Sequence, residues 1–239
     1  MATATPTARS ARTQVGPPLI APVLAYGVLM VISVILVAGG PEPSASASAV
    51  LAYDQGHQTA LEVAGCLGFA ASLPLAIWTA AVYRRLRTTL GVVAPGAVIG
   101  LVGGLLAAAS LALTGLITWT SSQVHTLAGP ALARALADLS FATGSAGFVA
   151  PLGLLVAGIA VPSLILGFLP RPLAWAGLII AAISLLSTFA LLTSDLDFTF
   201  PVGRFLGLLW LIMASVLLPA RRRTAHRQTG RAESEPVAP

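Results

Sequence analysis

The amino-acid sequence predicts an all-α fold: a polytopic membrane helix bundle of six transmembrane helices with both termini in the cytoplasm. Three observations support this prediction. Hydrophobic residues make up 56% of the chain and charged residues only 9%, whereas soluble domains carry about 25% charged residues. Several long stretches contain no Asp, Glu, Lys or Arg, and a helix needs roughly 20 apolar residues to cross a bilayer. The arginines are distributed unevenly around these stretches.

The charge-free stretches define the expected domain organisation. Hydrocarbon offers no water to the backbone, so each stretch is expected to close its hydrogen bonds as a helix. The predicted spans are about 17–39, 61–83, 91–119, 140–169, 172–194 and 201–220. Residues 1–16 form a flexible cytoplasmic leader and residues 221–239 a disordered basic cytoplasmic tail. Kinks are expected at Pro74, Pro151 and Pro162, which fall inside spans.

The placement of the arginines predicts the orientation, because cytoplasmic loops are enriched in Lys and Arg. With six spans, most arginines fall on one side: Arg9, Arg12, Arg84, Arg85, Arg87, Arg171, Arg221, Arg222, Arg223, Arg227 and Arg231. Only Arg134 and Arg204 remain on the other side, which we therefore take as the outer face. An alternative remains for the first span, because the following PEPSASASA resembles a signal-peptide cleavage region. Its length favours a retained helix.

The basic balance of the chain predicts contact with lipid. The formal net charge is +5, but the arginines lie at span ends and in the tail, so no nucleic-acid partner is expected. Arginines beside a span attract anionic lipids at the cytoplasmic face. The single Cys66 excludes an internal disulfide. A membrane-protein partner or a homodimer stays open.

Small and hydroxylated residues recur along one face of the third span. At about 100° per residue they form a stripe that predicts close helix packing, with a dimer interface or a substrate groove as alternatives. The stripe comprises Gly96, Gly100, Gly104, Ser110, Thr114 and Thr118.

The loop after the third span contains GPALARALADLSF. Leu132, Ala135, Leu136 and Leu139 recur at helical spacing, which predicts a short amphipathic helix lying in the outer interface. An Arg134–Asp138 pair, four residues apart, would add little stability.

Several polar residues of the outer face are candidates for a functional site. Imidazole and carboxylates could bind a divalent metal or supply acid–base catalysis, but their spacing matches no metal motif. The candidates are Asp54, His57, Glu62, His125, Asp138, Asp195, Asp197 and Arg204. The favoured interpretation is solvated loop charges, so we assign no catalytic, cofactor-binding or metal-binding residue. Arg204, one turn inside the last span, is expected to snorkel to the headgroups and meet Asp195 and Asp197 there.

From about Tyr53 to Ala220 the chain resembles a bacterial integral-membrane family catalogued as a domain of unknown function. The resemblance lies in YRRLR (83–87), PGAVIGLVGGLLAA, FATGSAGFVAPLGLLVAGIAVPSLILGFLPRPLAWAGL and FPVGRFLGLLWLIMASVLLP. It implies a multi-helix protein of the bacterial cytoplasmic (inner) membrane and carries over no site residues.

The sequence is compatible with three alternative hypotheses about the function. The first is a non-enzymatic membrane scaffold acting through partners, which predicts a well-packed bundle without a polar cavity. The second is a binder or transporter of a neutral or amphipathic small molecule, with a cavity lined by Ser110, Thr114, Ser184 or Ser187. The third is an outer-face metal site or enzyme that would need His57 and His125 to converge with carboxylates.

Overall fold

A computed structural model describes residues 18–42, 44–89, 95–124 and 129–219, so the predicted leader and tail lie outside the described residues. All regular secondary structure in these ranges is helical, which confirms the all-α class. The α-helices are α1 (Ile20–Leu36), α2 (Ala47–Gly56), α3 (Gln58–Arg84), α4 (Pro95–Val124), α5 (Pro130–Gly144), α6 (Ala146–Leu166), α7 (Arg171–Leu186), α8 (Thr199–Pro201) and α9 (Gly207–Leu217). Short 3₁₀ turns follow α7 at Ser187–Leu191 and Ser194–Leu196, and π-helical turns occupy Arg85–Thr89 and Val202–Leu206.

The chain is a multi-pass membrane protein. Five helical segments are long and apolar enough to cross a bilayer: Gln58–Thr88, Pro95–Gln123, Pro130–Leu166, Arg171–Leu191 and Ser194–Leu217. Helix α1 is also apolar but shorter, at 17 residues. Large apolar side chains such as Ile165 (74% exposed) and Ile35 (65%) point outward. This is the surface expected of a protein whose solvent is lipid.

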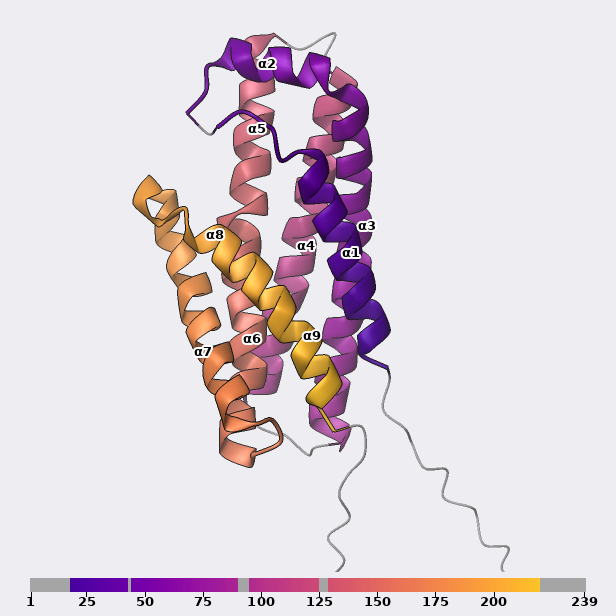
Figure 1. Ribbon diagram of the computed structural model, residues 1–239, viewed down its shortest axis with the longest axis vertical. Helices are drawn as coiled ribbons and strands as arrows, with labels where there is room; N and C mark the ends of the chain where they lie inside the picture. Colours follow the sequence, from indigo (N-terminus) through magenta and orange to yellow (C-terminus); the bar gives the residue numbers. More distant parts are fainter. Residues whose placement is uncertain (1–17, 43, 90–94, 125–128, 220–239) are drawn as a thin grey trace, which may run out of the picture.

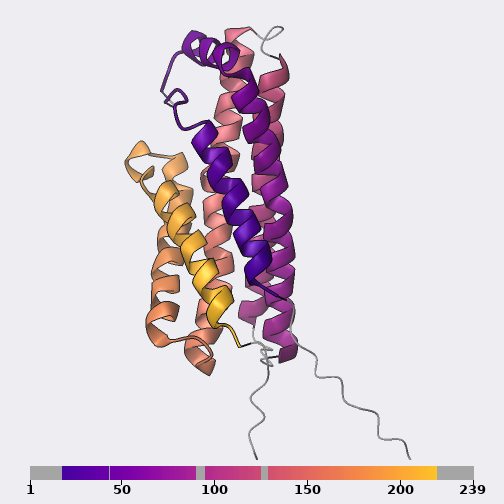
Figure 2. The same ribbon diagram turned by 45° about the vertical axis from the view of Figure 1, so that its right-hand side comes forward.

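The helices form one elongated bundle in which α4 packs between α3 and α6. Helix α1 lies against α3, α7 lies against α6, and α9 crosses over the gap between α1 and α7 (Figures 1 and 2). The chain enters α1 and leaves α9 at the same end of the bundle, where α3 also ends and α7 begins. The first and last described helices therefore run in opposite directions through the bundle.

The helices differ in length, and this difference produces a cap at one end. At 1.5 Å per residue, the 37 residues of Pro130–Leu166 measure about 55 Å and the 31 of Gln58–Thr88 about 46 Å. The hydrocarbon core is about 30 Å thick. Helices α3, α4 and α5 therefore rise beyond the shorter α7 and α9, and α2 lies across their tops (Figure 1). We call α2, α5 and the upper ends of α3 and α4 the cap.

The cap contains one helix that was not predicted from the sequence and one helix whose orientation was predicted wrongly. The segment after the first span contains the helix α2, begun by Ser46, whose hydroxyl accepts a hydrogen bond from the Ala49 amide. Helix α5 does not lie in the interface but stands along the bundle (Figure 1) and packs against α4 and α2. It buries the small Ala133, whereas Leu132 and Leu139 are half exposed. Small residues, not the leucine stripe, face the neighbouring helix because they allow closer packing.

The predicted fourth span contains a helix break that was not predicted from the sequence. Helix α6 continues through both Pro151 and Pro162. The break falls at Ser145, whose φ of −88° and ψ of −99° end α5 and separate it from α6. Only Ser145 separates α5 from α6, so the two helices together form one long helix with a single break.

The predicted packing stripe on α4 contacts three different helices. Gly100 approaches Gly158 of α6 so closely that a methyl group at Gly158 would overlap the Gly100 backbone, and Gly96 lies over Pro162. Gly104 faces Thr79 of α3. Farther along, Thr114 and Thr118 hydrogen-bond to Thr143 and Ser140 of α5, at 3.0 Å each.

Hydrogen bonds between distant helices position α9. The indole of Trp78 on α3, fully buried, donates to the hydroxyl of Ser215 at 2.8 Å. Trp210 donates to the Leu173 carbonyl of α7, also at 2.8 Å. At the end of α9 the guanidinium of Arg85 donates to the Leu218 carbonyl at 3.3 Å. Because α9 directly follows the π-helical turn Val202–Leu206, these hydrogen bonds also fix the position of that turn.

Replacing Gly158 by alanine is expected to destabilise the protein by about 1 to 3 kcal/mol, because the added methyl group forces α4 and α6 apart. The matched control is Gly39→Ala, where nothing lies within 4 Å of the added atom. Thermal unfolding of both variants in neutral detergent measures the difference. Equal melting temperatures for the two would contradict the close packing of α4 on α6.

Replacing Ser215 by alanine is expected to cost about 1 to 3 kcal/mol, because the buried Trp78 indole N–H loses its acceptor. Ser163→Ala is the control, since that buried hydroxyl only bonds the Ile159 carbonyl of its own helix. Unfolding midpoints and tryptophan emission report the two changes. A Ser163→Ala variant as unstable as Ser215→Ala would show that the interhelical bond contributes nothing.

Candidate functional site

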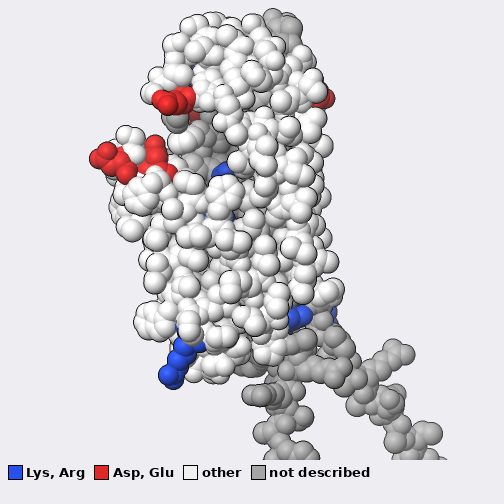
Figure 3. Space-filling model, viewed as in Figure 1, with Lys and Arg blue, Asp and Glu red and all other residues white. Residues whose placement is uncertain are grey.

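A cavity of about 610 Å³ lies below the cap, where the shorter helices end. Its wall is mostly apolar and includes Val34, Val37, Val50, Phe141, Phe200 and Phe205. Charged side chains from four parts of the chain also line it: Glu42, Asp54, Arg134, Asp138 and Arg204. Figure 3 shows a hollow on this face between two groups of acidic side chains, with blue arginine atoms inside it. An apolar wall with a few charged groups is typical of a small-molecule site.

Arg204 lines the cavity from the segment Ser194–Leu217, which is long and apolar enough to cross a bilayer. Its guanidinium Nη2 donates to the backbone carbonyl of Gly144, at the junction of α5 and α6. The same guanidinium lies over the ring of Phe148, 5.4 Å from the ring centre, an arrangement in which the ring face attracts the cation. The side chain is thus directed into the bundle and held from two sides.

The carbonyl that Arg204 uses exists because the long helix is interrupted. The last four carbonyls of a helix have no partner within it, and the break at Ser145 places the end of α5 inside the bundle. The Phe141 carbonyl accepts from the Ser145 amide at 2.8 Å, whereas the Gly144 carbonyl accepts from Arg204. The partial negative charge of a helix C-terminus also favours a cation at this position.

A π-helical turn, Val202–Leu206, carries Arg204. Such turns hold one extra residue, and they are frequent at functional sites. Gly203 lies within this turn, and a Cβ there would sit 2.7 Å from the Ser184 hydroxyl of α7 and 2.5 Å from Val149 of α6. Because Gly203 has no side chain, the turn can approach α6 and α7 closely. This close approach determines how far Arg204 extends into the bundle.

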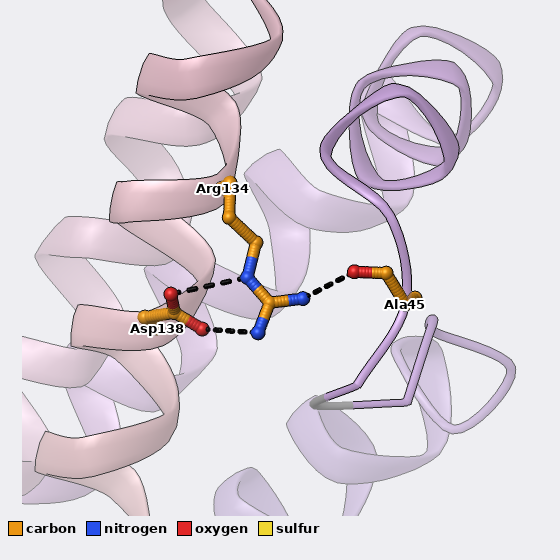
Figure 4. Close-up of polar contacts among 3 residues, drawn as sticks. All are labelled: Ala45, Arg134 and Asp138. Carbon is orange, nitrogen blue, oxygen red and sulfur yellow. Dashed lines mark hydrogen bonds and ion pairs between the residues drawn. The ribbon is translucent and has the colours of Figure 1, made fainter.

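Arg134 joins the two parts of the cap above the cavity (Figure 4). Its guanidinium binds both carboxylate oxygens of Asp138, with Nε to Oδ2 at 3.0 Å and Nη2 to Oδ1 at 2.9 Å. Nη1 donates to the Ala45 carbonyl, just before α2. The Asp138 carboxylate orients this guanidinium, so α5 holds the chain that enters α2.

Tyr53 and Asp54 form the α2 side of the cavity. Burial raises the pKa of the Tyr53 hydroxyl, and the neighbouring Asp54 carboxylate raises this pKa further. The phenol therefore stays protonated at neutral pH and can donate a hydrogen bond. The ring of Tyr53 stacks on His57, with ring centres 4.2 Å apart, and this imidazole faces the Tyr53 carbonyl through Nδ1 at 3.0 Å.

The structure brings three of the sequence candidates together at the cavity: Asp54, Asp138 and Arg204. His57, Glu62 and Asp195 are exposed and Asp197 is partly buried, and none of these four lines the cavity. His125 lies outside the described residues. Among the described residues, no three His, Cys, Asp or Glu side chains are grouped as they would be around a metal ion. Of the hydroxyls expected around a ligand, Thr114 lines the cavity, whereas Ser110, Ser184 and Ser187 do not.

The predicted pairing of Arg204 with Asp195 and Asp197 is wrong. Neither carboxylate forms an ion pair with Arg204 in the described part of the chain. Asp195 instead accepts from the Thr193 hydroxyl at 3.2 Å, within its own exposed turn. The second 3₁₀ turn leaves Asp195 exposed and is followed directly by Asp197, whereas the π-helical turn directs Arg204 towards the Gly144 carbonyl. Arg204 therefore does not snorkel along the protein surface.

Sequence reasoning missed three contributors to the site. Tyr53 was not a candidate, Arg134 was treated only as one half of a helix pair, and the carbonyl of Gly144 has no side-chain signal at all. The adjacent Gly144-Ser145-Ala146-Gly147 run of small residues could have indicated a helix break.

No protein-family model matches the chain, and neither a curated protein nor a solved structure is detectably similar to it.

Proposed function

We propose that the chain crosses the bacterial cytoplasmic membrane six times, with α1 as the first span and both termini in the cytoplasm. The 17 residues of α1 are at the lower limit for a spanning helix. An even number of crossings agrees with the entry of α1 and the exit of α9 at one end of the bundle (Figure 1). The arginines that flank α3 and α7 lie at that end, which is the expected cytoplasmic side.

In this membrane the protein binds an amphipathic, lipid-like small molecule and is not an enzyme. The observation that carries this proposal is the cavity below the cap, which combines a predominantly apolar wall with charged groups. Its volume of about 610 Å³ falls within the range of roughly 300 to 1,000 Å³ for small-molecule sites. A purely apolar ligand would leave the charged groups without polar partners. A purely polar ligand would leave the apolar wall in contact with water.

The position of the cavity supports the same ligand class. It is lined by residues of the cap and by Phe200, Pro201 and Phe205 near the start of the last span, a level that the proposed orientation assigns to the outer headgroups. An amphipathic molecule dissolved in the outer leaflet already has its polar group at this depth. It can therefore bind without transferring its chain through water.

The two other functions receive less support. The scaffold hypothesis predicted a well-packed bundle without a polar cavity. The cavity below the cap, lined by charged side chains, does not fit that prediction. A metal site requires convergent ligands, and the described residues group no three His, Cys, Asp or Glu side chains for one. Membership of the bacterial family of unknown function stays a prediction and adds no activity.

Cysteine labelling tests the threading. In a Cys66→Ser background, a membrane-impermeant maleimide added to intact cells is expected to label Ser48→Cys at the outer end. Thr88→Cys, at the end of α3, should react only after permeabilisation. Both positions are exposed. Reaction of Thr88→Cys in intact cells would overturn the orientation.

Filling the cavity tests the binding function. Ala137 lines the cavity from α5, and Ala135 of the same helix is exposed outside it. The Ala137→Trp variant is expected to bind 1-mono-oleoylglycerol at least about tenfold more weakly than the wild type, because the indole occupies the space of the ligand. Ala135→Trp should bind normally. Native mass spectrometry of the full-length protein in neutral detergent measures both. Unchanged binding by Ala137→Trp, or no binding by the wild type, would contradict the proposal.

A further inference from the structure

The cavity contains a cation without a matching anion. Arg204 forms no ion pair with any carboxylate in the described ranges, and its only hydrogen bond there goes to a neutral backbone carbonyl. Its Nε is buried and has no acceptor. Burial of a charge without a partner costs several kcal/mol, and ionisable groups within membrane spans are usually retained for function.

The surrounding protein offsets this charge only in part. The C-terminus of α5 contributes at most about half an elementary charge, and only over its last turn. The N-terminus of α6 follows directly after Ser145 and carries a partial charge of the opposite sign. The ring of Phe148 adds a cation–π contact. The Tyr26 hydroxyl interacts electrostatically with Arg204 but is itself buried without a hydrogen-bond partner. Glu42 and Asp54 also line the cavity, but neither forms an ion pair with Arg204 in the described ranges, so this guanidinium has no counter-ion there.

We propose that Arg204 binds the anionic headgroup of the amphiphile, so that the natural ligand carries a phosphate or carboxylate attached to an acyl chain. This inference rests on the proposed function and adds the chemical class of its ligand. A planar guanidinium with free donors matches the oxygens of either group.

The walls of the cavity distinguish an amphiphile from a free anion. Phe200, Pro201 and Phe205, from the same stretch as Arg204, line the cavity together with Val34 and Val37 of α1. A soluble phosphate would leave this apolar surface uncovered, whereas an acyl chain covers it and gains free energy by doing so. The headgroup supplies the missing negative charge, and the chain fills the space beside it.

Three ligands with the same oleoyl chain test the proposal: oleate, 1-oleoyl-lysophosphatidate and neutral 1-mono-oleoylglycerol. Their binding to the full-length protein in neutral detergent is measured by native mass spectrometry, with inorganic phosphate as a competitor. The wild type should prefer at least one anionic ligand over the neutral one by about tenfold or more, as charge-assisted hydrogen bonds imply. In Arg204→Gln this preference should disappear while binding of mono-oleoylglycerol stays unchanged.

Arg171→Gln is the matched control, because this exposed arginine begins α7 at the opposite end of the bundle. It should leave all three affinities unchanged. Thermal unfolding adds a second readout: loss of an uncompensated charge should leave the ligand-free Arg204→Gln protein at least as stable as the wild type. A purely structural arginine would instead lower both the melting temperature and the binding of all three ligands.

Each result separates the two proposals. Equal affinity of the wild type for the three ligands overturns the role of Arg204 but leaves the amphiphile site standing, and this comparison needs no variant. An equal decrease in affinity for all three ligands in the Arg204→Gln variant also overturns the role of Arg204 in headgroup binding. Displacement of the anionic lipids by phosphate at a similar concentration would identify a free anion as the ligand. Absence of all binding would reject the site itself.

Discussion

A hydrocarbon layer of nearly constant thickness has to accommodate helices of very different lengths in this protein. Only regular hydrogen-bonded helices are stable in such a layer, and the longest segment here is about 55 Å against a core of about 30 Å. The excess has to stand outside the hydrocarbon. The cap, the cavity beneath it and the change from apolar to polar side chains between α6 and α5 all follow from this mismatch.

Close packing in the lower part of the bundle fixes the geometry of the upper part. The approach of Gly100 to Gly158 joins α4 to α6, and the bonds of Trp78 and Trp210 hold α9 against α3 and α7. With α6 and α9 positioned in this way, the end of α5 and the turn that carries Arg204 meet inside the protein. The site is therefore assembled by interhelical contacts well away from its own side chains.

The all-α class was predictable from the sequence because long charge-free stretches in hydrocarbon are expected to close their backbone hydrogen bonds as helices. The break at Ser145 was not predictable from the prolines, because Pro151 and Pro162 are tolerated inside α6 while small residues end α5. The orientation of α5 was predicted wrongly because its leucines suggested an amphipathic helix lying in the outer interface. In the structure Ala133 is buried, and the small side chain lets α5 pack closely along the bundle.

The candidate site was harder to predict, for a physical reason. Sequence distance placed Arg204 beside Asp195 and Asp197, which suggested an ion pair at the interface. Whether two such side chains meet depends on the local winding of the backbone, and a π-helical turn between them changes that winding. The carbonyl partner at Gly144 is supplied by the main chain, so no side-chain pattern reveals it.

The single wide turn in the last helix has a consequence for how this protein can change. One extra residue in a helix rotates everything on one side of it by about 100° relative to the other side. Loss of that residue would leave the segment Ser194–Leu217 almost as long and as apolar as before, yet it would turn the guanidinium of Arg204 by about 100° relative to α9. A one-residue deletion in this turn would thus move the guanidinium away from the Gly144 carbonyl without changing the hydrophobic character of the segment.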